Sequence, residues 1–177
     1  MKTFIISAGH SDKDPGAVAA GVTEASIVTE LRDLVAGALV VEGHTVFVDG
    51  DVGENKPLRE ALKLFVHKGA IAIEFHCNAA ANPAARGIES IALNGSLKPL
   101  CQKLSKAIAD VLGEPVRGDN GFIDPTKSAR GKLAWCDAGG IIVETFFLSN
   151  PASLAKYKTD KKLVVDAIVK VLLEHAK

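Results

Sequence analysis

Short apolar runs alternate with longer segments of helical period along the chain, and this alternation limits the possible folds more than any other feature. The runs are rich in β-branched residues and almost continuously hydrophobic. That pattern is typical of strands covered on both faces of a mainly parallel sheet. We therefore expect strands at residues 3–8, 45–49, 70–75, about 88–93 and 141–146.

The segments between these runs carry apolar residues at helical spacing. Thr23 is a suitable N-cap for the first, Pro57 suits the start of the second, and Gly113 ends the third. The alternation of strands and helices predicts an α/β fold, a twisted, mostly parallel sheet with helices on both faces. We expect helices at 24–42, 57–67, 97–112 and about 160–175, with apolar faces that include Leu34, Leu58, Val66 and Leu163.

The bulk properties exclude several classes of protein. A chain of 177 residues is most simply one domain, 1–177. Its 21 basic and 21 acidic residues balance, which argues against a nucleic-acid partner or an anionic membrane recognised by bulk charge. Three widely spaced cysteines do not predict a disulfide framework. No apolar stretch is long enough for membrane insertion or for a signal peptide, so we expect synthesis in the cytoplasm.

Residues 114–140 depart from the alternation. They are rich in glycine, proline, aspartate and arginine and have no clear period. A loop of this length in a compact domain is usually functional, so we expect a wall or lid over a site.

Polar residues stand at the ends of three predicted strands. His10 follows "FIISAG", His76 follows "AIAIEF", and Glu144 ends "GIIVE". In open α/β sheets ligands bind outside the carboxyl ends of the strands. A single histidine at a strand end is usually only a loop residue, but three such residues at one edge predict a site.

Two histidines and a carboxylate are the ligand set of a hydrolytic zinc site. Glu24 is a good third ligand because it opens a helix and can turn back toward His10, although a glutamate there also suits the helix dipole. Glu144 lies in a very apolar run, where an ionised carboxylate needs compensation. A catalytic role is the preferred interpretation, and a buried ion pair with Arg130 or Lys132 is the alternative.

The remaining candidates have simpler interpretations. His44, His67 and His175 are expected at turns or helix ends. Cys77 is expected in the core, because successive strand residues face opposite ways. Trp135 suits either a site wall or the core.

Four separated motifs resemble those of the zinc-dependent N-acetylmuramoyl-L-alanine amidases of the family-3 type, found in bacterial autolysins and phage endolysins. They are "ISAGHSDKDPGA", "GVTEASIVTEL", "EFHCNAA" and "GIIVETFFLSNPASLAKY". The match covers nearly the whole chain, and the order and spacing of the motifs make it specific. The resemblance implies a twisted, mostly parallel sheet flanked by helices.

The resemblance also implies the roles of four residues. His10, Glu24 and His76 would be ligands of one catalytic zinc ion, and Glu144 would be the catalytic acid-base. The implied reaction is hydrolysis of the amide between N-acetylmuramic acid and L-alanine of the peptidoglycan stem by zinc-activated water. The alternatives are a non-catalytic peptidoglycan-binding or regulatory module and a zinc peptidase that cuts within the stem.

The sequence departs from the family pattern at two places. Glu74 replaces a small residue two positions before the second histidine, and strand alternation would point it to the same side as His76, where it could orient that ring. A surface position at an irregular strand end is the other interpretation. Thr145 and Phe146 follow the catalytic glutamate, where the family commonly has glycine.

The biological setting follows from the same resemblance. We expect no separate wall-binding domain, and a leaderless single-domain amidase of this kind resembles a phage endolysin, which accumulates in the cytoplasm and reaches the wall during phage lysis. A bacterial or prophage housekeeping enzyme is the alternative. We expect a monomer that acts on peptidoglycan.

Overall fold

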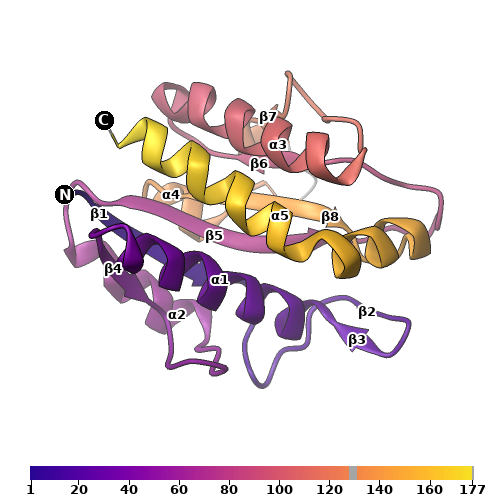
Figure 1. Ribbon diagram of the computed structural model, residues 1–177, viewed down its shortest axis with the longest axis horizontal. Coiled ribbons are helices and arrows are strands. Elements are labelled where there is room, and N and C mark those ends of the chain that lie inside the picture. The colour runs from indigo at the N-terminus through magenta and orange to yellow at the C-terminus, as the bar shows by residue number, and fades with distance from the viewer. Residues whose placement is uncertain (128–130, 177) are drawn as a thin grey trace.

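The computed structural model describes residues 1–127 and 131–176, and within these ranges a six-stranded sheet forms the centre of the molecule (Figure 1). The strand order is β4-β1-β5-β8-β6-β7, and every neighbouring pair is parallel except β6 with β8. The predicted fold class is confirmed. The strands are β1 Thr3–Ala8, β4 Thr45–Val48, β5 Ile71–Asn78, β6 Glu89–Ile91, β7 Phe122–Ile123 and β8 Ile141–Phe147.

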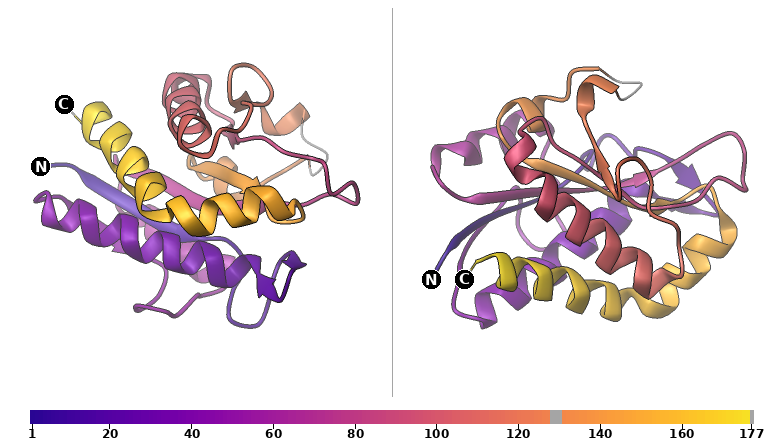
Figure 2. Two further views of the ribbon diagram at one scale, coloured as in Figure 1. Left: turned by 45° about the vertical axis from the view of Figure 1, so that its right-hand side comes forward. Right: turned by 90° about the horizontal axis from the view of Figure 1, so that it is seen from above.

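Helices cover both faces of this sheet. Figure 2 shows the three long helices together on one side, where they pack on alternate strand residues such as Phe4, Ile6 and Ile73. The intervening residues, such as Ile5 and Ala72, face the short helices on the other side. The long helices are α1 Glu24–Val41, α3 Lys98–Leu112 and α5 Pro151–His175, and the short ones are α2 Leu58–Ala61, η1 Leu62–Val66 and α4 Ala134–Asp137.

Two predicted helices differ from the observed ones. The expected helix at 57–67 is four residues of α-helix followed by a 3₁₀ segment, which leaves Leu58 and Val66 exposed. The last helix begins at Pro151, well before residue 160, because Asn150 caps it by accepting hydrogen bonds from the amides of residues 152 and 153. Leu163 in this helix and Leu34 in α1 are also exposed, so these positions of the predicted apolar faces are wrong.

Several short elements were not predicted. A hairpin of β2 Val18–Ala19 and β3 Val22–Thr23 precedes α1, and strand β7 lies within the irregular region 114–140. Each of these strands has only two residues, too few to show a period. The remaining short elements are the 3₁₀ helices η2 Gly95–Leu97 and η3 Pro125–Lys127.

The irregular region contributes to the core as well as to the surface. Trp135 in α4 is buried, and its indole Nε1–H donates to the carbonyl of Ile141, so the core interpretation of this residue is confirmed. Among the described helices, none combines the length and the apolar character needed to cross a membrane.

Candidate metal centre

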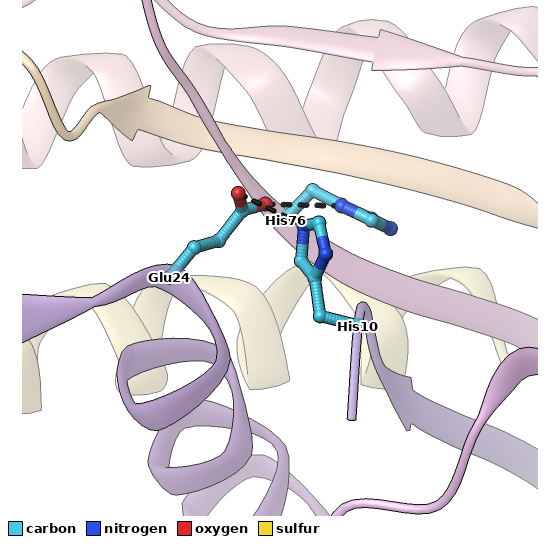
Figure 3. Close-up of side chains that lie close together, drawn as sticks. All are labelled: His10, Glu24 and His76. Atoms are coloured by element: carbon cyan, nitrogen blue, oxygen red, sulfur yellow. Dashed lines mark hydrogen bonds and ion pairs between the residues drawn. The ribbon is translucent and has the colours of Figure 1, made fainter. Parts of the chain in front are cut away.

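Three side chains from separate elements converge at the carboxyl end of the sheet. His10 follows β1, Glu24 is the first residue of α1, and His76 lies near the end of β5. The parallel pairing of β1 with β5 brings the two histidines to the same edge. One ligand atom from each of the three residues lies within 4.8 Å of the others, and Figure 3 shows the Glu24 carboxylate directed at both rings. The structure therefore brings together all three predicted ligands.

A tight turn holds His10. Its backbone has φ 70°, in the left-handed region, and Nδ1 of its ring lies 3.1 Å from Oδ2 of Asp14. Gly16 packs on the ring so closely that an added Cβ would lie 2.5 Å from Nε2. Because Asp14 takes Nδ1, the other nitrogen faces Glu24, 2.9 Å from its Oε2.

Glu24 lies at the start of α1, after the predicted cap. Thr23 accepts a hydrogen bond from the amide of Ser26, which confirms it as the N-cap. The Glu24 carboxylate is buried rather than solvated and accepts hydrogen bonds from the amides of Ala17 (3.1 Å) and Cys77 (2.9 Å). A first-turn glutamate that only complemented the helix dipole would not need to turn inward.

His76 lies between two carboxylates. Its Nδ1 is 3.1 Å from Oε1 of Glu24, and its Nε2 is 3.1 Å from Oε2 of Glu74. Glu74 is 4% exposed, so of its two interpretations the one facing His76 is the observed one. Gly9 packs on the ring, since an added Cβ would lie 2.2 Å from Cε1.

The electrostatics of the site favour a positive charge. Burial alone would raise the pKa of Glu24, but the interactions with His10 and His76 outweigh it and hold that pKa well below the usual range. Burial alone would lower the pKa of His76, but hydrogen bonds to Glu24 and Glu74 raise it to about 10. The pKa of His10 is also raised, chiefly by its interaction with Glu24. Without a metal ion, protons supply the positive charge.

These residues fit a divalent metal ion. The donor set is two imidazoles and one carboxylate, the protein ligands of catalytic zinc sites that leave one position open. Nε2 of His10 is buried, and its contact with Glu24 lacks hydrogen-bond alignment, so no described residue hydrogen-bonds to it. Each imidazole has its other nitrogen held by a carboxylate, as ligand histidines usually do.

Glu144 lies beside this cluster. It is on β8, in direct register with His76 on β5, and is 5% exposed. Residues in register on neighbouring strands point to the same face and lie about 5 Å apart. Of its proposed ion-pair partners, Arg130 lies outside the described residues and Lys132 is exposed, so that alternative stays a prediction.

A pocket of about 300 Å³ opens onto the cluster. His10, Asp14, Glu74 and His76 form its polar side, while Pro57 and Leu58 at the start of α2 contribute apolar surface. No residue of the irregular region 114–140 is among those described around it, so the wall or lid role expected of that region also stays a prediction.

The other histidines and the Cys77 thiol contribute no ligand to the site. His44 accepts a hydrogen bond from the amide of Lys2, and His67 stacks on Phe47. Cys77 is buried in the core on the opposite face from His76, as predicted. Asp14 is the site residue whose contact was not predicted, although a carboxylate four residues after a histidine in a tight turn is a usable signal.

Comparisons with known proteins agree with this geometry. The sequence profile of a family described as N-acetylmuramoyl-L-alanine amidase matches residues 4–174. A Neisseria meningitidis protein assigned as an N-acetylmuramoyl-L-alanine amidase is 40% identical, with a TM-score of 0.88, 99% of this chain and 96% of that chain being covered. No curated protein matches the chain.

More distant structures share the fold. The catalytic domain of CwlV, an N-acetylmuramoyl-L-alanine amidase from Bacillus (Paenibacillus) polymyxa, is 20% identical with a TM-score of 0.82, covering 99% of this chain and 98% of that one. The catalytic domain of the CD27L endolysin, which targets Clostridia difficile, is 22% identical with a TM-score of 0.72, and 98% of each chain is covered.

Proposed function

Since the chain belongs to the N-acetylmuramoyl-L-alanine amidase family, we propose that it cleaves the bond between N-acetylmuramic acid and L-alanine in peptidoglycan as a zinc-dependent enzyme. The convergence of His10, Glu24 and His76 carries the proposal. These three side chains would hold the ion. When bound, zinc lowers the pKa of water to about 7 and polarises the carbonyl under attack.

Glu144 is the proposed acid-base residue. Its register with His76 supports this role, because residues in register on neighbouring strands point to the same face of the sheet. It would accept a proton from the attacking water and deliver it to the departing L-alanine nitrogen. Proton transfer by a positioned side chain typically contributes between about 10²- and 10⁴-fold to the rate.

The pocket gives the substrate a place beside His10 and His76. Its apolar side, Pro57 and Leu58, would contact the alkyl parts of the lactyl–alanyl junction. Leu58 is exposed, which supports contact with a substrate. The scissile carbonyl would then face the cluster of His10, Glu24 and His76.

The endolysin-like setting stays a proposal. We infer synthesis in the cytoplasm, release to the wall during phage lysis, and action as a monomer. The similarity to the CD27L catalytic domain supports the shared fold alone. Timed immunoblots of cytoplasm and culture fluid during lysis would test this setting.

The products of digestion test the function. Purified sacculi treated with the zinc-loaded protein should release stem peptides with a free N-terminal L-alanine, detectable by mass spectrometry. Stems cut internally would instead identify a peptidase, and binding to sacculi without soluble products would identify a binding module. Either result would overturn the proposal. His76→Ala should lose both zinc and products, while His67→Gln, which changes a histidine far from the site, should keep both.

A further inference from the structure

Glu74 is a carboxylate in an unusual place for a central strand. It lies in the middle of β5, next to Ser7 of β1 and Ile142 of β8, and its side chain is 5% exposed. An ionised carboxylate in such surroundings is costly unless a hydrogen-bond donor or a cation compensates it. Among the described residues, His76 compensates it: Nε2 of its ring lies 3.1 Å from Oε2 of Glu74 and donates a hydrogen bond to it.

This contact determines how the His76 ring presents its two nitrogens. A neutral imidazole has one nitrogen that donates and one that accepts. In a neutral ring whose Nε2–H donates to Glu74, the lone pair would be on Nδ1, the nitrogen that lies 3.1 Å from Glu24 and faces the other ligands. If the ring carried its hydrogen on Nδ1 instead, the lone pair would point at the Glu74 carboxylate, away from Glu24.

Packing around the His76 ring does not determine which of its nitrogens carries the hydrogen, whereas the contact with Glu74 does. Gly9 packs on the ring and limits its tilt, since even a Cβ there would overlap the ring atoms. Packing alone does not choose between the two nitrogens, because it places no donor or acceptor. His10 has the corresponding arrangement, with Asp14 at Nδ1 and Nε2 facing Glu24.

We propose that Glu74 is a positioning residue for the metal centre, which accepts the Nε2 hydrogen of His76 and thereby presents Nδ1 to the ion. The inference rests on the proposed zinc-dependent function. It predicts that His76 binds the metal through Nδ1 and His10 through Nε2. Loss of a carboxylate that orients a ligand histidine typically lowers metal affinity by about 10- to 100-fold.

Zinc binding to the metal-free protein, measured by competition with a chromophoric chelator, tests this proposal. Glu74→Ala should raise the zinc Kd about 10- to 100-fold. Glu74→Gln keeps the size of the side chain and can still accept a hydrogen bond, but without charge, so it should raise Kd by a smaller factor. Should the alanine variant fail to fold, the glutamine variant carries the test.

Glu89→Gln is the matched control. Glu89 lies on β6 in register with Glu144 and bonds Asn78 and Arg117 rather than a proposed ligand. The same substitution there should leave the zinc Kd unchanged. An equal loss at Glu74 and Glu89 would show only a general effect of charge and would overturn the proposal.

Imidazole ¹⁵N NMR of the zinc-loaded protein shows which nitrogen of His76 is protonated and which binds the metal. A merely structural role of Glu74 makes no prediction about these two nitrogens. Wild type should show a protonated Nε2 and a metal-bound Nδ1 on His76. Zinc bound through Nε2, or a wild-type Kd in both Glu74 variants, would overturn the proposal, as would a wild-type protein that binds no zinc. A zinc-binding protein that released no L-alanine peptides would overturn the proposed function but not this inference.

Discussion

Zinc binding should release protons, because the metal-free site holds them tightly. The pKa of His76 is raised to about 10 after hydrogen bonding outweighs burial. A histidine must be neutral to bind a metal ion, so the proton between its ring and Glu24 has to leave. A pH of 7 is about three units below the pKa of this group. Removing the proton at that pH therefore weakens zinc binding about 10³-fold, on the order of 4 kcal/mol.

The zinc Kd should therefore fall about tenfold for each unit that the pH rises between 7 and 10. The slope should be steeper at the lower end, where His10, whose pKa is also raised, has to lose a proton too. Chelator competition between pH 6.5 and 9 gives the slope, and calorimetry in buffers of different ionisation enthalpy gives the number of protons released. A Kd that changes less than about threefold from pH 7 to 9 would refute the reasoning.

The raised pKa of His76 should also affect the stability of the metal-free protein. A histidine with a raised pKa contributes stability that is fully present below its unfolded value, about 6.5, and is lost as the pH rises through about 10. The Tm of the metal-free protein should therefore decrease over this window relative to the zinc-loaded protein, in which the proton is already gone. Parallel Tm profiles for the two forms would contradict this expectation.

Three further predictions concern positions around the site and in the core. Gly9→Ala should displace the His76 ring, because the new Cβ would lie 2.2 Å from Cε1 of that ring, and chelator competition should show zinc binding weakened at least tenfold. The control Gly37→Ala should leave zinc binding unchanged, because an added Cβ there would have nothing within 4 Å. Arg32→Ala should lower the free energy of unfolding in urea by about 3–5 kcal/mol, because it leaves the buried carboxylate of Asp49 without its 2.8 Å partner; a loss below 1 kcal/mol would show that the pair is dispensable. The three cysteine thiols should resist alkylation at pH 8 until the protein is unfolded, since all are buried and burial raises the pKa of Cys101 and of Cys136 to about 12; fast labelling of the native protein would disprove this.

Much of the fold could be predicted because the central strands are long and buried on both faces. The strands β1, β5 and β8 are six to eight residues long, and each contains a short apolar run that predicted it. These runs marked the edge where His10 and His76 lie, whereas Glu144 lies within β8, because that strand continues to Phe147. Elements decided by one or two local contacts could not be predicted. The early start of α5 depends on the Asn150 cap, in a stretch without apolar period.

The candidate site was likewise predictable where it depended on strand alternation and unpredictable where it depended on single local contacts. Strand alternation predicted the side on which Glu74 lies, because a period of two requires only the strand. It could not distinguish a contact with His76 from a surface position, which depends on what covers that end of β5. The contact between Asp14 and His10 was missed because it requires a left-handed residue at position 10, a conformation that nothing in the apolar pattern indicates.

The most direct test of the account is the rate of amide cleavage by Glu144→Gln at matched zinc content. The substitution keeps the shape of the side chain and leaves His10, Glu24 and His76 in place, so zinc should bind at about one ion per chain. The rate of release of L-alanine-terminated peptides should fall by about 10²- to 10⁴-fold. A zinc-loaded Glu144→Gln variant that released these peptides at the wild-type rate would contradict the account.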